Sequence, residues 1–277
     1  MNVPALLYKT AWLPLTPRGV AAFATARFRR VFWVQFVFAL LAAAAVGWFL
    51  HAAIAPTFRA AIDALPDESR ITTGVLMWPT NSAQPVLLAE GRVISVVVDL
   101  DQTGRVAGSA DLKLQFGRSD WQLASFFGVL HAPGLLDTTY PLAYTVALNR
   151  ADLLPWWGAR EPFLIGLVMV GMVVHLFASW WTLATLYTPL VWLGAFFGNR
   201  DVGLLGCWRM AGAALMPGAV FMTAAIVFYG LGAFQLPQLL LAVVMHLVVG
   251  WFYLVVSLMA LPHIATAAAP KKNPFKP

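Results

Sequence analysis

Four long apolar stretches constrain this chain more than any other feature of its sequence. They lie near residues 31–50, 163–187, 208–234 and 238–261. Each approaches or exceeds the roughly 20 residues that a helix needs to cross a hydrocarbon core of about 30 Å. Only 11% of all residues are charged, far from the roughly 25% of a soluble domain. We therefore expect an integral membrane protein with about four transmembrane helices.

Basic residues beside the apolar stretches predict the orientation, because Lys and Arg resist translocation. They precede the first stretch, lie between the second and third, and follow the fourth: Lys9, Arg18, Arg27, Arg29, Arg30, Arg200, Arg209, Lys271, Lys272 and Lys276. We expect both termini on the cytoplasmic side of a bacterial inner membrane. Residues 51–161, with eleven of the twelve acidic residues, then lie outside. The net charge of +6 thus follows from topology and predicts no nucleic-acid partner.

These patterns divide the chain into five expected segments. They are a basic, amphipathic N-terminal segment (1–30), transmembrane helix 1 (31–54), an extracytoplasmic β-rich domain (55–161), a three-helix transmembrane bundle (162–262) and a basic tail (263–277). Within the bundle, residues 188–206 are expected along the cytoplasmic interface, and Pro217 should kink the third span without dividing it. The N-terminal segment starts a helix at Thr16-Pro17 and could lie on anionic headgroups, or act only as a topology anchor.

The extracytoplasmic segment has the alternation of apolar and polar residues that is typical of β-strands. Ile94, Val96, Val98 and Leu100 would share one face of a strand, and residues 112–116 alternate strictly. Further strands are expected at 121–130, 75–78 and 144–148, and a helix at 55–65 that Pro66 stops. We expect a small antiparallel sheet with one buried face.

Residues 96–104 have the strand and D-x-D-x-T order of haloacid-dehalogenase-type phosphatases. In that resemblance Asp99 would be the nucleophile and Asp101 the acid/base. Phosphoryl transfer also needs Mg²⁺ and cationic groups, and no later acidic pair completes such a site. A calcium loop would need at least six oxygen ligands. We interpret the segment as an Asp-rich turn, in which short side chains bond the local backbone, and predict no catalytic residue, no metal and no cofactor.

Two histidines lie within the apolar stretches, where ionisable side chains are costly and often functional. His175 and His246 would sit at similar depths, and His175, Ser179 and Thr182 form a polar stripe at helical spacing. The stripe could serve a proton relay, a metal site or haem ligation. The interpretation that we favour is hydrogen bonding between helices.

Other residues predict how the helices pack. Gln35 should bond a neighbouring helix. Pairs of small residues, Ala43 with Gly47 and Ala214 with Gly218, should allow close approach of helices within the chain rather than between chains. The single cysteine, Cys207, excludes an intramolecular disulfide.

The order of these features resembles a family of bacterial multi-pass membrane proteins that is sometimes linked to maltodextrin utilisation. The resemblance rests on the lead from Leu7-Tyr8-Lys9 to Pro17, the basic turn into the first span, the strand that ends at Asp99 to Gly104, and the clustered later spans. It implies a multi-pass membrane protein and transfers no catalytic residues.

Two functions are compatible with these features. The first is a non-enzymatic accessory, scaffold or regulatory subunit whose extracytoplasmic domain contacts an envelope or membrane protein. The second is a small transporter or cofactor-bearing subunit that uses His175 and His246. The sequence does not predict the oligomeric state.

Overall fold

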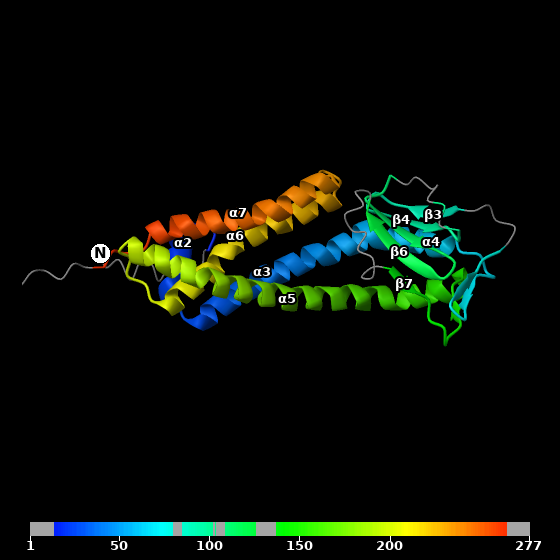
Figure 1. Ribbon diagram of the computed structural model, residues 1–277, viewed down its shortest axis with the longest axis horizontal. Helices are drawn as coiled ribbons and strands as arrows, with labels where there is room; N and C mark the ends of the chain where they lie inside the picture. Colours follow the sequence, from blue (N-terminus) through cyan, green and yellow to red (C-terminus); the bar gives the residue numbers. More distant parts are fainter. Residues whose placement is uncertain (1–13, 80–84, 102, 104–108, 126–136, 265–277) are drawn as a thin grey trace, which may run out of the picture. The chain divides into compact units, whose positions relative to one another are not determined.

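The computed structural model describes residues 14–79, 85–101, 103, 109–125 and 137–264 (Figure 1). The chain forms two compact units, which we call the helical unit (Met1–Ala44 and Val170–Pro277) and the sheet unit (Ala45–Met169). Four helices are long and apolar enough to cross a membrane, and a small β-sheet domain lies between the first and second of them in the chain. The coarse fold prediction is therefore confirmed.

The four long helices are α3 (Phe28–Phe49), α5 (Arg150–Phe197), α6 (Leu204–Gly230) and α7 (Leu236–Met259). Only α5 extends beyond its predicted span at both ends, whereas α3, α6 and α7 both begin and end a few residues earlier than predicted. α5 continues to Phe197, so the first half of the segment expected along the cytoplasmic interface, 188–206, is helical. Residues 190–197 are apolar enough to prolong the helix, and Pro189 removes only one backbone donor from it.

α6 is a single helix with Pro217 inside it, as predicted. It packs along α7 (Figure 1). A Cβ on Gly218 would overlap the backbone oxygen of His246, and Gly250 of α7 lies in van der Waals contact with the Ala214 backbone. The small residues thus allow two helices of the same chain to approach closely, which confirms the packing prediction for Ala214 and Gly218.

Residues 19–24 of the N-terminal segment are buried against other helices, whereas Arg18, Arg27 and Arg29 are exposed. Thr16 caps α2 (Pro17–Ala22) by accepting a hydrogen bond from the Gly19 amide at 3.0 Å. α2 contacts α7, and the short helix η1 (Phe23–Thr25) contacts α6. Val20 and Phe23 are fully buried in this core. Burial of such side chains contributes about 1.5–3 kcal/mol each, which favours the core over the surface.

Gln35 makes the interhelical hydrogen bonds that its position predicted. Its side chain is fully buried. Nε2 donates to the Gly212 carbonyl on α6 at 3.4 Å, and Oε1 accepts from Trp181 Nε1 on α5 at 3.0 Å. Both polar ends of the amide are thereby bonded, so three helices are joined without an unsatisfied buried group.

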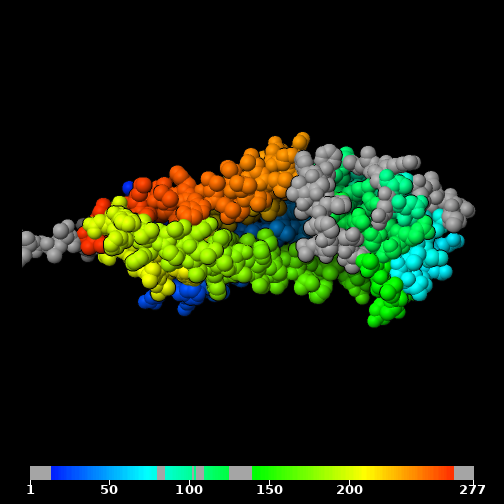
Figure 2. All heavy atoms as spheres, in the orientation of Figure 1, coloured from blue at the N-terminus to red at the C-terminus, as the bar shows by residue number. Residues whose placement is uncertain are grey.

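The outer surface of the helical unit is apolar. Figure 2 shows the side chains of α5 (green to yellow) and α7 (orange) along its visible face. Exposed residues on these two helices include Val170, Val174, Leu186, Leu190, Phe196, Leu241, Val244, Val248, Phe252 and Val255. Soluble proteins rarely expose contiguous apolar surfaces of this extent, so this surface fits a lipid environment.

The sheet unit holds two sheets. The larger has the order β3-β4-β5-β6-β7 and the smaller, which we call the small sheet, β2-β1-β8. The strands are β1 (Arg70–Thr72), β2 (Val75–Met77), β3 (Val86–Glu90), β4 (Ile94–Val98), β5 (Leu112–Phe116), β6 (Asp120–Ser125), β7 (Asp137–Thr139) and β8 (Val146–Ala147). β2, β4, β5, β6 and β8 confirm predicted strands in part, whereas β1, β3 and β7 were not predicted. Residues 126–130 of one predicted strand lie outside the described residues.

The centre of the larger sheet differs from the prediction in two respects. β4 and β5 pair in parallel, from Ile94 with Leu112 to Val98 with Phe116, so the sheet is mixed rather than antiparallel. The intervening residues 99–111 are long enough for the crossover of about a dozen residues that a parallel pair requires. All five residues of β4 are buried, so the expected single buried face is wrong. A central strand that is covered on both faces has buried side chains on both, so an alternating sequence does not mark one of its faces as exposed.

A helix covers part of this sheet. α4 (Ala55–Asp63) follows α3 through a π-helical turn, η2 (Leu50–Ile54), and contacts β3 and β4 (Figure 1). It confirms the helix predicted before Pro66. Its apolar face, together with the sheet and the start of α5, surrounds a pocket of the sheet unit.

Candidate functional site: an apolar pocket beside a buried carboxylate

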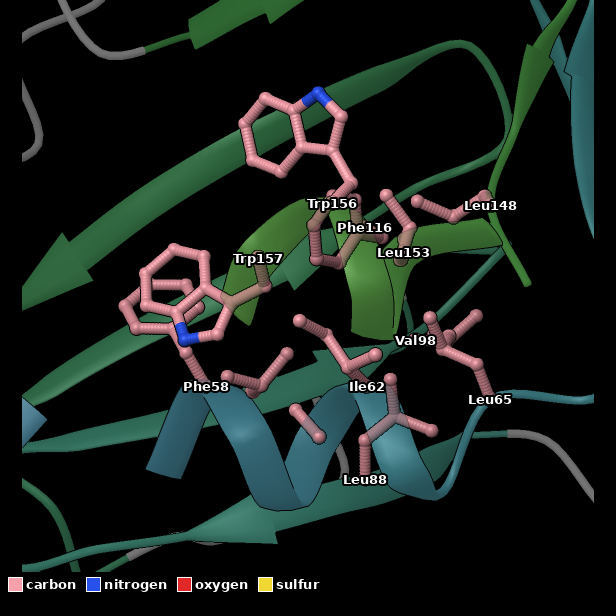
Figure 3. Close-up of a pocket in the computed structure, with 12 residues that line it drawn as sticks. Phe58, Ile62, Leu65, Leu88, Val98, Phe116, Leu148, Leu153, Trp156 and Trp157 are labelled. Atoms are coloured by element: carbon pink, nitrogen blue, oxygen red, sulfur yellow. The ribbon is translucent and has the colours of Figure 1, made fainter. Parts of the chain in front are cut away.

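An apolar pocket of about 150 Å³ lies between α4, the larger sheet and the start of α5 (Figure 3). We call it the sheet pocket. It is lined by Phe58, Ala61, Ile62, Leu65, Leu88, Val96, Val98, Phe116, Leu148, Leu153, Trp156 and Trp157. None of these side chains is charged. An engineered protein cavity of about this size, with a similar lining, stays dry and binds benzene. The sheet pocket is therefore suited to an apolar group and unsuited to a polar substrate.

The pattern of α4 explains why the helix presents an apolar wall. Ala61, Ile62 and Leu65 follow the helical spacing of one face and are buried, whereas Arg59 and Ala60 are exposed on the other. At one end of the pocket, Phe58 stacks on Trp157 with ring centroids 5.5 Å apart (Figure 3).

A second hollow of about 120 Å³ adjoins the sheet pocket at this aromatic pair. We call it the helix crevice. It is lined by Leu50, Ile54, Ala55, Phe58, Trp157, Glu161, Leu164, Ile165 and Val168. These residues belong to η2, to α4 and to the part of α5 where an apolar stretch begins. Phe58 and Trp157 line both hollows.

Glu161 is a buried carboxylate in the wall of the helix crevice, with a side chain only 6% exposed. Arg59 donates to its Oε2 at 2.8 Å, and His51 Nδ1 lies 3.1 Å from its Oε1. Both partners are largely exposed, whereas the carboxylate that they contact is buried. The sequence analysis gave neither Glu161 nor His51 a role. The sequence signal for this site was the position of Glu161 directly before an apolar stretch, where a charged side chain needs a partner.

His51 lies in η2, the π-helical turn between α3 and α4. π-turns inserted into helices often occur at functional sites, because the extra residue redirects side chains. Here the turn accompanies a contact between His51 and a residue more than a hundred positions later in the chain. The cluster thereby joins the start of the sheet unit to its end.

The Asp-rich loop forms the local hydrogen bonds of a turn. Asp99 is fully buried, and its Oδ1 accepts from the amide of Thr103 at 3.0 Å and from its hydroxyl at 3.2 Å. Asp101 is exposed and pairs with Arg118 at 3.0 Å. At the far end of the loop, the amide and hydroxyl of Ser109 donate to exposed Glu90 and lower the pKa of that carboxyl. The two aspartates therefore have different environments and separate partners.

The three residues of the predicted polar stripe, His175, Ser179 and Thr182, all lie on α5. Ser179 Oγ lies 3.4 Å from His175 Nε2 on α5, and Thr182 is exposed. His246 on α7 is half-buried, and its Nδ1 has no hydrogen-bond partner in the described chain. No hydrogen bond joins His175 to His246 among the described residues. The same part of the chain contains no group of three or more His, Cys, Asp or Glu side chains that could hold a metal ion.

Comparisons with models of protein families, with curated proteins and with solved structures find no match to this chain. The site is therefore interpreted from its own geometry.

Proposed function

We propose that the protein is a non-enzymatic accessory or regulatory subunit of a bacterial inner membrane, and that its extracytoplasmic sheet unit contacts an envelope protein. The four apolar helices and the apolar surface of the helical unit support the membrane assignment. The basic residues beside these helices support cytoplasmic termini, with the acidic sheet unit outside.

One observation supports the partner contact above all others. The small sheet and the loop beside it expose large apolar side chains: Met77 is 50% exposed and Leu142 is 79% exposed, and Val75 and Tyr144 are exposed with them. We call these four residues the apolar tip. Leu142 lies against the turn at Gly74 that precedes β2, so part of the tip is one continuous surface. Exposed apolar residues grouped on a water-facing domain are typical of protein interaction sites.

The test places a photoreactive amino acid at Met77 in the full chain and irradiates intact cells. The proposal predicts a discrete cross-linked partner, whose yield falls at least tenfold when Leu142→Glu is added. The matched control is Leu87→Glu, an exposed leucine of the larger sheet, which should leave the cross-link unchanged. Absence of any cross-link from Met77 and from Tyr144, in a chain that is folded and inserted, would refute the proposal.

The second candidate function is a transporter or cofactor-bearing subunit that uses His175 and His246. The observation in its favour is the buried Nδ1 of His246, which lacks a partner within the described residues. Purified protein would then carry metal or haem, or show pH-dependent transport that His246→Ala abolishes. If the purified chain had none of these properties, the second candidate would be refuted and the accessory role would remain.

A further inference from the structure

We propose that the sheet pocket and the helix crevice together bind the acyl chain of a lipid. This inference rests on the proposed function in one respect, because it requires the sheet unit to stand next to a membrane that supplies the chain. It goes beyond that function by assigning a ligand site that is separate from the apolar tip.

The chemistry of the lining selects the ligand class. The twelve side chains around the sheet pocket are aliphatic or aromatic. They offer dispersion contacts to a hydrocarbon and no charged partner for a polar substrate. A sugar, a nucleotide or a metal ion placed there would lose its hydration without compensating hydrogen bonds.

The size of the two hollows indicates the length of the chain. A cavity of about 150 Å³ holds a six-carbon ring in another protein. By that measure the sheet pocket of about 150 Å³ and the helix crevice of about 120 Å³ would together hold roughly ten to twelve carbons. The ligand is thus a medium-length alkyl chain, or the end of a longer one.

The position of the helix crevice provides the route. Its wall includes Leu164, Ile165 and Val168, which belong to the apolar stretch of α5 that we expect to enter the bilayer. Phe58 and Trp157 line both hollows, so a chain that leaves the lipid along this wall passes the aromatic pair to reach the sheet pocket. Arg59 and His51 both contact Glu161, which lines the crevice, and their side chains are largely exposed. Arg59 places a cationic donor, and His51 a ring nitrogen, where an acidic headgroup would remain in water.

The experiment uses the full chain in native membranes and a palmitic acid that carries a photoreactive diazirine near the end of its chain. After irradiation, labelled peptides are mapped by mass spectrometry. The inference predicts adducts on the peptides that contain residues 58–65 and 153–157. Unlabelled fatty acids should compete with this probe. Their competition should strengthen about fourfold for each added methylene, up to a chain of roughly ten to twelve carbons, and then level off.

Ala61→Phe is the decisive variant, because the ring that it adds matches the volume of the sheet pocket. It should reduce labelling of these peptides at least tenfold. Ala60→Phe is the matched control, since Ala60 is exposed on the same helix, and it should label like the parent. If Ala61→Phe does not fold, Leu65→Phe replaces it. Labelling that is confined to the membrane spans, or that is equal in both variants, would overturn the inference.

Two further measurements separate the possible outcomes. Organic extraction of the purified protein identifies whether the chain belongs to a phospholipid, a free fatty acid or a lipidated protein. Cross-linking from Met77 is scored in the same preparations. A partner cross-link without acyl labelling refutes only the lipid site, whereas acyl labelling without a partner cross-link refutes only the accessory role.

Discussion

Replacing Gly218 with alanine should separate α6 from α7 and destabilise the helical unit. The new Cβ would overlap the backbone oxygen of His246, and real Cβ contacts below 3.0 Å are essentially never seen. The two helices must therefore move apart at this contact. A backbone atom cannot rotate away as a side chain can, so the strain is relieved only by displacing one helix.

The magnitude follows from two opposing terms. Overpacking of a close contact costs about 1–3 kcal/mol, and alanine regains up to about 1 kcal/mol over glycine through its helix propensity. We expect a net loss of about 1–2 kcal/mol for Gly218→Ala. Gly171 on α5 is the matched control, because a Cβ added there meets no atom within 4 Å. Gly171→Ala should be neutral or stabilise by up to about 1 kcal/mol.

The assay is reversible unfolding of the purified protein in mixed micelles, with increasing fractions of a denaturing detergent and helix content as the readout. The two variants should lie about 1–3 kcal/mol apart in free energy of unfolding. Equal stability of both variants, or a more stable Gly218→Ala, would refute the close approach of α6 and α7 at this position.

Further predictions concern three polar contacts. Arg59→Ala should destabilise the sheet unit by about 1–3 kcal/mol, because it removes the guanidinium that donates to the buried Glu161 at 2.8 Å; thermal unfolding should show it, and a loss no larger than that of His51→Ala would contradict the assignment. Burial, and next the charge of Asp120, raises the pKa of Tyr140, so folding favours its protonated form. Stability should then be level at neutral pH and fall as pH rises above the ordinary tyrosine value near 10, and Tyr140→Phe should reduce this alkaline loss. Gln35→Ala should cost about 1–3 kcal/mol by leaving Trp181 Nε1 without its acceptor, and unchanged unfolding in micelles would count against that hydrogen bond.

The helices could be predicted from the sequence because apolar length alone is enough to identify them. The interhelical bonds of Gln35 and the close approach at Gly218 could also be predicted, since a polar amide or a glycine within such a stretch has few other roles. The burial of Val20 and Phe23 could not, because their pattern fits a membrane surface as well as a protein core. Only the contacts of α2 and η1 with α6 and α7 distinguish the two.

The sheet unit was predicted less completely for two physical reasons. Parallel pairing of β4 and β5 depends on the path of the intervening loop, which local alternation does not encode. The sheet pocket combines residues from α4, three strands and the start of α5, so no local motif marks it. The cluster at Glu161 likewise joins residues about a hundred positions apart, and only its carboxylate beside an apolar stretch could have been noticed.

The central claim, that the sheet unit is exported while the termini stay inside, is tested most directly by cysteine labelling. In a Cys207→Ala background, Asp67→Cys in the sheet unit and Asp201→Cys between α5 and α6 are treated with a membrane-impermeant maleimide; both positions are exposed. The account predicts that the cysteine at position 67 reacts on intact cells with a permeable outer envelope, and that the one at position 201 reacts only after the cells are broken. The reverse pattern, or equal reaction of both only after lysis, would contradict it.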